Sequence, residues 1–288
     1  MITHEKPIDL FIVGGQKTAS TSVFNWLKIT GQFNSHCQTE MSYYMYEHEK
    51  IEGKEKAFKR YFPFSDEKLR LAKHVMAAYC PETLGFIKSD NPNVKVIYIT
   101  REPIKRIYSA YWYARFNGWE KEEDIITAIE RNEKNKNTDH NLNYISNSDY
   151  EVHIERLVNL FGKDNVLVLS DVDVSYGKKS VIEKVGNFVD LKLNVVEAVP
   201  DSFNESKLPK SYLLSKVLNY IFSESNPIKK YFNMLVSPNR RVLIRKSLLS
   251  LNRSKHSYPK ISLEEKNKII KKIPHILNYY NSMVKYDG

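Results

Sequence analysis

Residues Leu10–Ser22 decide the fold of this chain, and they read LFIVGGQKTASTS. The apolar residues predict a buried strand, the glycines predict a turn, and the hydroxyl-rich end predicts the start of a helix. Backbone N–H groups at such a turn point toward one spot, and the helix dipole favours negative charge there. Together with the charge of Lys17, this turn predicts a site for a phosphate-like group. Its hydroxyl groups belong to Thr18, Ser20, Thr21 and Ser22.

The turn does not match a nucleoside-triphosphate P-loop. A Walker A loop needs a glycine directly before the lysine and another five residues earlier, but Gln16 and Phe11 occupy these positions. The turn instead resembles the 5′-phosphosulfate loop of sulfotransferases, which use 3′-phosphoadenosine 5′-phosphosulfate (PAPS) and read roughly Lys-Thr-Gly-Thr-Thr. The resemblance implies that Lys17 stabilises the leaving phosphate and that the loop binds the 5′ end of PAPS. The implied loop residues are Gln16, Lys17, Thr18, Ala19, Ser20, Thr21 and Ser22, with Ala19 where glycine is usual.

A second motif follows another predicted strand, residues 93–100 (NVKVIYIT). The next segment, Arg101–Tyr111, reads REPIKRIYSAY, and its proline suits the first turn of a helix. It resembles the 3′-phosphate motif of sulfotransferases, in which an arginine at the strand end is followed by proline, arginine, serine and tyrosine. The resemblance implies that Arg101 and Ser109 bind the 3′-phosphate, and a guanidinium matches phosphate oxygens well. Arg106 remains open between a structural ion pair and a ligand contact.

A third segment concerns the catalytic base. Sulfuryl transfer requires a base for the acceptor proton and a cation for the charge on the leaving oxygen. Gln38–Tyr44 (QTEMSYY) resembles the Lys-Glu-x-His-Phe-Phe segment of glycan sulfotransferases, although threonine and serine replace its lysine and histidine. The resemblance implies that Glu40 is the base and that the acceptor is a carbohydrate. His36 and His48 are alternative bases, because cytosolic small-molecule sulfotransferases use histidine.

The rest of the chain alternates predicted helices with apolar strands. Apolar spacing predicts helices over Tyr150–Phe161 and near Val181–Val189, and a strand over Val166–Asp171. This alternation predicts an α/β fold: a P-loop-like three-layer arrangement with a central parallel sheet flanked by helices. Ligands then bind beyond the carboxyl ends of the strands. The charged stretches 48–70 and 119–140 are expected at the surface.

We expect a single domain over residues 1–288, with a mostly helical elaboration from about residue 205 onward. The segment Leu263–Met283 predicts an amphipathic helix interrupted near Pro274. In sulfotransferases a flexible basic loop before the last helix closes over the 3′-phosphate. Arg253 and Lys255 occupy a comparable place, so the resemblance implies a contact with PAPS there.

Composition agrees with a polyanionic ligand. The formal net charge is +10, which attracts nucleic acid, anionic membranes or acidic small ligands. No nucleic-acid-binding module or dense basic stripe stands out, so nucleic acid is not expected as a partner. The two cysteines, Cys37 and Cys80, give no disulfide framework, and no Cys/His cluster has zinc spacing. We therefore expect PAPS and a carbohydrate acceptor as partners, without a metal.

The sequence predicts a PAPS-dependent sulfotransferase that transfers a sulfuryl group to a hydroxyl or, less favoured, an amine. Without a signal peptide or a membrane-spanning run, a cytoplasmic protein is expected, and the bias toward Lys, Asn, Ile and Tyr suggests a bacterial one. Two other classes remain open. One is a nucleotide kinase with a degenerate P-loop. The other is a nonenzymatic protein that binds a nucleotide or nucleic acid.

Overall fold

The computed structural model describes residues 6–64, 67–135, 139–195, 207–222 and 250–286, together with positions 244, 247 and 248. The chain forms two compact units. The first comprises Met1–Pro103, Asn147–Asn204 and His275–Gly288, and the second comprises Ile104–Ser146 and Glu205–Pro274. The expectation of a single domain stays a prediction.

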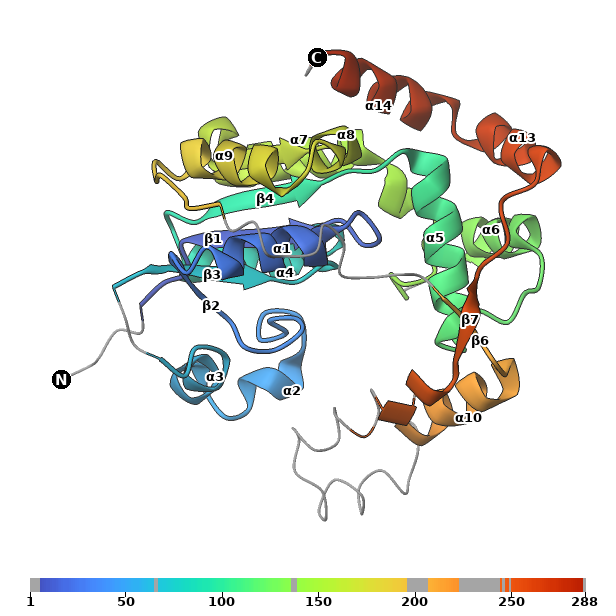
Figure 1. Cartoon of the computed structure of the whole chain (residues 1–288), viewed down its shortest axis with the longest axis horizontal. Coiled ribbons are helices and arrows are strands. Elements are labelled where there is room, and N and C mark those ends of the chain that lie inside the picture. The colour runs from blue at the N-terminus through green and yellow to red at the C-terminus, as the bar shows by residue number, and fades with distance from the viewer. Residues whose placement is uncertain are drawn as a thin grey trace. The chain divides into compact units, whose positions relative to one another are not determined.

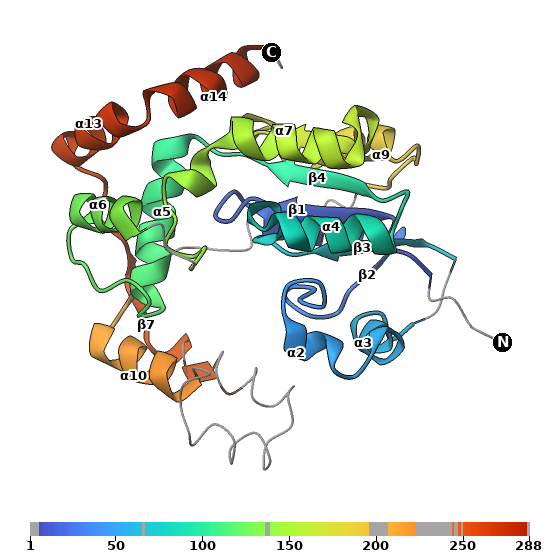
Figure 2. The ribbon, with the colours of Figure 1, turned by 180° about the vertical axis from the view of Figure 1, so that it is seen from behind.

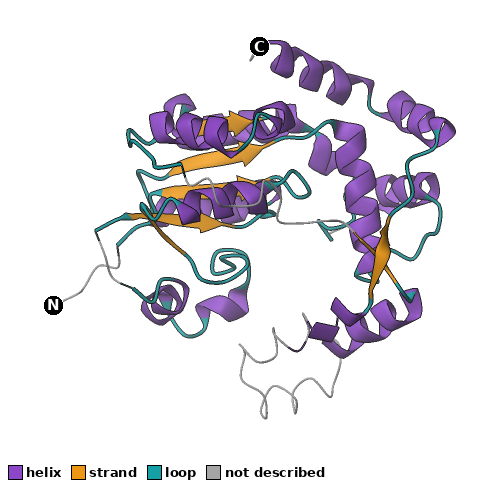
Figure 3. Cartoon of the chain, viewed as in Figure 1, coloured by secondary structure: helices purple, strands orange, loops and turns teal. Residues whose placement is uncertain are grey.

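The first unit is built on a five-stranded sheet in the order β2-β3-β1-β4-β5 (Figure 3). All four pairs of neighbouring strands are parallel, which confirms the predicted parallel sheet. The strands are β1 (Leu10–Gly14), β2 (Phe33–Ser35), β3 (Leu69–Lys73), β4 (Lys95–Ile99) and β5 (Val166–Leu169).

Side chains of the central strand alternate between two buried cores. Leu10 and Ile12 of β1 face one core, whereas Phe11 and Val13 face the other. Because successive side chains of a strand point to opposite faces, a continuous apolar run is what a strand covered on both sides requires. The sheet is therefore the middle of three layers, as the sequence predicted.

Helices cover both faces of this sheet. On one face lie α1 (Ser20–Ile29) and α9 (Lys178–Phe188), which contribute to the core with Leu10 (Figure 1). On the other lie α4 (Pro81–Asp90) and α7 (Tyr150–Phe161), seen from behind in Figure 2. The first unit also contains α2 (Glu47–Lys50), α3 (Lys54–Tyr61), α8 (Asp171–Ser175), most of α14 (Pro274–Tyr286), and the short 3₁₀ turns Ala77–Tyr79, Ser146–Ser148 and Lys163–Asn165.

The second unit is mainly helical. Its helices are α5 (Pro103–Phe116), α6 (Ile125–Asn135), α10 (Tyr212–Phe222) and α13 (Leu263–Lys272). Two short antiparallel strands, β6 (Lys207–Pro209) and β7 (Arg253–Ser257), complete it. The expected helical elaboration from about residue 205 onward stays a prediction, and in the described part of that region the predicted interruption near Pro274 separates α13 from α14.

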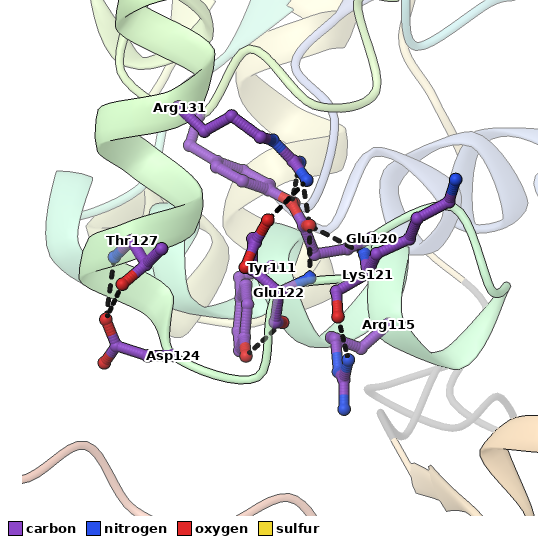
Figure 4. A network of polar contacts seen from close by, with 9 residues as sticks. Tyr111, Arg115, Glu120, Lys121, Glu122, Asp124, Thr127 and Arg131 are labelled. Atoms are coloured by element: carbon purple, nitrogen blue, oxygen red, sulfur yellow. Dashed lines mark hydrogen bonds and ion pairs between the residues drawn. The ribbon is translucent and has the colours of Figure 1, made fainter.

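A buried carboxylate organises the segment between α5 and α6 (Figure 4). Glu120 is 1% exposed and accepts hydrogen bonds from the N–H groups of Lys121 (2.7 Å) and Glu122 (2.9 Å). It also pairs with Arg131 (2.8 Å) and accepts the Tyr144 hydroxyl (2.9 Å). A buried charge is tolerated only when it is paired and hydrogen-bonded in this way. The stretch 119–140, which was expected to be a solvated surface, therefore contains a buried carboxylate that is held by hydrogen bonds and an ion pair.

The other stretch expected at the surface also differs from the prediction. Within residues 48–70, helix α3 buries Phe58 and Tyr61 against the core that includes Phe11 and Val13. Both aromatics lie among lysines and glutamates in the sequence, so their burial was hidden by the charge of their neighbours.

We predict that Asn91→Ala destabilises the first unit. Asn91 is fully buried, accepts the Ile8 N–H (2.6 Å) and donates to the Tyr44 hydroxyl (3.0 Å) and the Ile87 carbonyl (2.8 Å). Removing its side chain leaves buried polar groups without partners, at a cost of about 2–4 kcal/mol. Denaturant unfolding measures this change. The matched control is Asn93→Ala, at an exposed position; equal effects of the two substitutions would contradict the assignment.

Candidate functional site

Three charged residues lie at or shortly after the carboxyl ends of neighbouring parallel strands. Lys17 comes shortly after β1, Lys73 is the last residue of β3, and Arg101 comes shortly after β4. Strand β1 lies between β3 and β4 in the sheet. Because parallel strands end at the same edge, the fold places these three segments at one edge of the sheet. From β1 the chain continues to strands on one side of it and later to strands on the other side. Open α/β sheets bind ligands at such a switch in strand order.

The loop after β1 is held closely against β4. The Gly15 N–H donates to the Ile99 carbonyl (3.0 Å) and the Gln16 N–H donates to the Tyr79 hydroxyl (3.0 Å). A Cβ at Gly15 would lie 3.0 Å from that Ile99 oxygen, so a larger residue would force the backbone apart. The hydroxyls of Thr18 (2.8 Å) and Ser20 (3.3 Å) both donate to the Gly15 carbonyl. Here these two predicted ligands of a phosphate hold the loop together.

Helix α1 begins at Ser20, directly after the loop. Its first N–H groups have no acceptor within the helix, which is the feature that makes a helix start attractive to anions. Ala19 precedes the helix with φ +67° and ψ +16° and offers no side-chain cap. The Ala19 carbonyl accepts the N–H groups of Ser22 (2.8 Å) and Val23 (3.2 Å). The alanine therefore occupies the left-handed conformation that glycine adopts without strain.

Two positive side chains meet at this loop. The Arg101 guanidinium donates to the Lys17 carbonyl (3.0 Å), and the Tyr150 hydroxyl donates to the Arg101 carbonyl (2.6 Å). Burial, followed by the nearby charge of Arg101, lowers the pKa of Lys17 to about 8. Both effects disfavour a charged amine, and a bound anion would oppose both of them. The loop thus has the electrostatics of a phosphate site.

Glu40, the predicted base, forms an ion pair with a buried lysine. Lys73 is 1% exposed, and its amine donates to one oxygen of Glu40. The other carboxylate oxygen accepts the Val75 N–H (3.1 Å). Burial raises the pKa of Glu40, while the charge and hydrogen bond of Lys73 act in the opposite direction. The result is an oriented carboxylate that is more basic than an ordinary glutamate.

Lys73 was not singled out from the sequence. It ends the strand that reads LRLAK, whose mixed composition does not resemble a buried strand. The sequence feature that could have identified Lys73 is its position at the carboxyl end of a strand. This position can be recognised only after β3 has been assigned.

The two alternative bases lie in very different surroundings. His36 is fully buried beside the Phe24 ring (4.6 Å between centroids), and burial lowers its pKa to about 3. Its surroundings therefore keep it neutral and away from solvent. His48 lies on α2 with 60% of its side chain exposed and stacks on Tyr46.

The remaining predicted ligands lie in the second unit. Ser109 is on α5 and is 1% exposed, and within the described residues its hydroxyl has no hydrogen-bond partner. Arg106 is fully buried and donates to the Tyr144 carbonyl, which favours a structural role. Arg253 and Lys255 lie in β7, but their side chains fall outside the described part of the chain.

A three-layer α/β fold with two cations beside the start of a helix is typical of proteins that bind phosphate-containing ligands. Within that class the chain belongs to the sulfotransferase family, because the family profile described as Sulfotransferase domain matches residues 7–220. It is therefore a sulfotransferase, an enzyme of a family that uses PAPS. The kinase and nonenzymatic alternatives are set aside by this membership.

Solved structures agree with the fold. A sulfotransferase from Alicyclobacillus acidocaldarius is 16% identical with a TM-score of 0.60, over 74% of this chain and 90% of that one. A mouse sulfotransferase complexed with PAP is 15% identical with a TM-score of 0.51, over 94% of this chain and 84% of that one. No curated protein sequence matches the chain significantly.

We predict that Ala19→Gly stabilises the protein, because glycine removes the strain of a positive φ at this position. The gain is about 1 kcal/mol after the larger entropy of the unfolded glycine is included. Ala19→Val is the opposing control, since a β-branched residue is still less tolerant of this conformation. Thermal unfolding of both variants measures the effect. A melting temperature that is lower for glycine than for alanine would contradict the assigned backbone.

Proposed function

We propose that the enzyme transfers the sulfuryl group of PAPS to a hydroxyl of a carbohydrate acceptor, with an amine as the less favoured acceptor. PAPS supplies the activated sulfuryl group and a phosphate leaving group when it is bound. The observation that carries the proposal is the hydrogen bond of the Arg101 guanidinium to the Lys17 carbonyl just before α1, which brings the Arg101 charge close enough to lower the pKa of the Lys17 amine. Two cations held together there favour a multiply charged anion.

Lys17 is assigned to the leaving phosphate. A protonated amine beside the first turn of α1 stabilises the charge that develops on the leaving oxygen as the bond to sulfur breaks. The residues from Gln16 to Ser22 surround the 5′ end of the ligand, with the N–H groups of Ser20 and Thr21 as donors. The hydrogen bonds of Thr18 and Ser20 to Gly15 keep this loop in one conformation.

Arg101 and Ser109 are assigned to the 3′-phosphate, following the motif that the chain shares with its family. The buried Ser109 hydroxyl supports the assignment, because a buried hydroxyl without a partner carries a cost that a ligand oxygen would remove. Arg253 and Lys255 are proposed as further contacts to the same phosphate.

Glu40 is assigned to the acceptor. Its raised pKa makes it a better proton acceptor than an ordinary carboxylate, and its contacts to Lys73 and the Val75 N–H hold it in one orientation. Taking the proton from the hydroxyl as oxygen attacks sulfur keeps the nucleophile reactive. The carbohydrate assignment rests on the resemblance of Gln38–Tyr44 to glycan sulfotransferases. The protein's net charge of +10 agrees with an acidic glycan.

We predict that PAP binds more tightly than AMP and that its binding weakens as the pH rises above 8. Lys17 loses its proton through a pKa of about 8, so the bound phosphate loses a cation above that pH. The loss is at most about tenfold per pH unit. Titration calorimetry in buffers of different ionisation enthalpy measures both the affinity and the proton taken up on binding.

The matched variants separate the two cations. Lys17→Ala should abolish the proton uptake that accompanies PAP binding near pH 8. Arg101→Ala should weaken PAP binding by about tenfold or more and change the affinity for AMP less. Lys28→Ala, at the exposed end of α1, is the control and should behave as the wild type. Equal affinities for PAP and AMP in the wild type would rule out the 3′-phosphate site.

We predict that Glu40→Gln lowers transfer to a carbohydrate acceptor by about 100-fold or more in kcat while PAP affinity is retained, because general base catalysis contributes that much. The measurement is transfer of labelled sulfate from PAPS to a panel of glycans. Glu47→Gln is the control: this glutamate lies in the same region with 86% of its side chain exposed. Full activity of Glu40→Gln would exclude Glu40 as the base.

The same assay tests the lysine that orients Glu40. Lys73 lowers the pKa of Glu40 by its charge, so Lys73→Met should raise that pKa. The acid limb of the pH–rate profile should then move to higher pH, because Glu40 becomes protonated at a higher pH than in the wild type. A purely structural role for Lys73 would reduce the amount of folded protein without moving that limb.

A further inference from the structure

The positive charge of the chain is concentrated in one segment. Residues 207–260 contain 12 of the 44 lysines and arginines but only one of the 34 acidic residues, Glu224. This segment therefore carries a formal charge of +11, whereas the remainder of the chain is close to neutral. The basic residues of this segment are spread among apolar ones and form no dense motif. Two of these cations, Arg253 and Lys255, are proposed above as contacts to the 3′-phosphate of PAPS, and the other ten have no role in that site.

Helix α10 lies near the start of this segment, directly after β6, and one of its faces is held by contacts within the second unit. The Arg115 guanidinium lies over the Tyr212 ring (4.5 Å to its centroid). The Asn252 amide donates to the Ser215 hydroxyl (2.9 Å), and Ser215 and Leu218 are buried. A Cβ at Gly118 would lie 3.0 Å from backbone atoms of α10. These contacts fix the orientation of α10 within the second unit.

The opposite face of α10 is apolar and exposed. Leu213, Val217 and Tyr220 follow the i, i+4, i+7 spacing of one helix face, and Leu213 is 73% exposed. Leu214 and Ile221 widen the same face and are also exposed. Burying large apolar side chains normally stabilises a protein, so an exposed stripe of them indicates a surface that interacts with something else.

A second exposed stripe follows later in the same segment. Ile244, Leu248 and Leu251 share the i, i+4, i+7 spacing at helical positions, and Leu251 is 68% exposed. The next residue, Asn252, accepts the Ser211 N–H (3.0 Å) and donates to the Ser211 carbonyl (3.0 Å). Asn252 thereby ties the end of this stripe to the start of α10. We call the exposed stripe on α10 the apolar face.

We propose that the apolar face docks the enzyme on an anionic lipid surface. Exposed lysines flank it: Lys210 precedes α10, and Lys216 lies beside the Leu213–Tyr220 stripe. Apolar side chains enter the boundary of the lipid tails while the lysine amines remain at the headgroups, which is how interfacial helices bind. The described residues of 207–260 include no aspartate or glutamate, so these residues add no repulsion toward anionic headgroups.

Lipid is favoured over the other possible occupants by the combination of charge and apolarity. A nucleic acid would use the lysines but would gain little from exposed leucines. A second copy of this chain would bring another strongly basic segment against this one. Each lysine or arginine near an anionic membrane strengthens binding, and buried apolar surface adds to it. Among the described residues, no helix combines the length and apolarity needed to cross a bilayer, so binding would be peripheral.

The test is co-sedimentation with vesicles. We expect at least about tenfold stronger partitioning onto vesicles of phosphatidylcholine and phosphatidylglycerol than onto phosphatidylcholine alone, with the difference reduced by high salt. The double variant Leu213→Ser, Val217→Ser should lose at least about tenfold of the anionic binding. The double variant Lys210→Gln, Lys216→Gln should weaken binding to the anionic vesicles alone.

Two matched controls separate docking from general hydrophobicity. Ile51→Ser and Leu263→Ser also replace exposed apolar side chains, at 84% and 75% exposure, but lie outside residues 207–260. They should bind vesicles as the wild type does. Unchanged PAP affinity and melting temperature show that each variant is folded. The proposal is overturned if neutral and anionic vesicles bind equally, if the serine double variant binds as the wild type, or if that variant instead loses self-association or oligonucleotide binding.

Discussion

The parallel pairing of β1 with β3 on one side and β4 on the other is the constraint on which the site depends. Each strand runs in the same direction, so the residues that follow β1 and β4, and the last residue of β3, reach one edge of the sheet. This pairing places Lys17, Lys73 and Arg101 there although they are far apart in the chain. The apolar cores on both faces of β1 hold that register, because a slip by one residue would exchange the two faces.

The site concentrates charge that folding alone would disfavour. Lys17 has a lowered pKa because it is buried beside Arg101, and Lys73 is buried against a glutamate whose own pKa is raised. Ala19 adds a backbone conformation that alanine tolerates poorly. Departures from the most stable arrangement commonly gather at functional sites, where a ligand compensates for them. The buried Glu120 carboxylate differs from these site residues. Its hydrogen bonds and ion pair come from Arg131, Tyr144 and backbone N–H groups of the protein itself.

Local patterns predicted the elements whose sequence matches their environment. Tyr150–Phe161 forms α7 with the predicted ends, and β4 and β5 lie within the apolar runs expected to be strands. Strands β2 and β3 were missed, because Asn34, Arg70 and Lys73 interrupt their apolar pattern. Those polar side chains are buried through particular partners: Arg70 lies over the Phe62 ring (5.0 Å) and Lys73 pairs with Glu40. No sequence period encodes such partners.

The sequence by itself determined the α/β class, the strand–turn–helix around Lys17 and the family resemblance, since all three depend on short runs of residues and their spacing. Only the tertiary structure decided that Glu40 is paired with Lys73, that His36 is sealed in the core, and that one face of α10 is exposed while the other is anchored. These facts depend on which segments meet in space. Burial and charge act through distance in three dimensions, so they follow from the packing of the chain and not from its order.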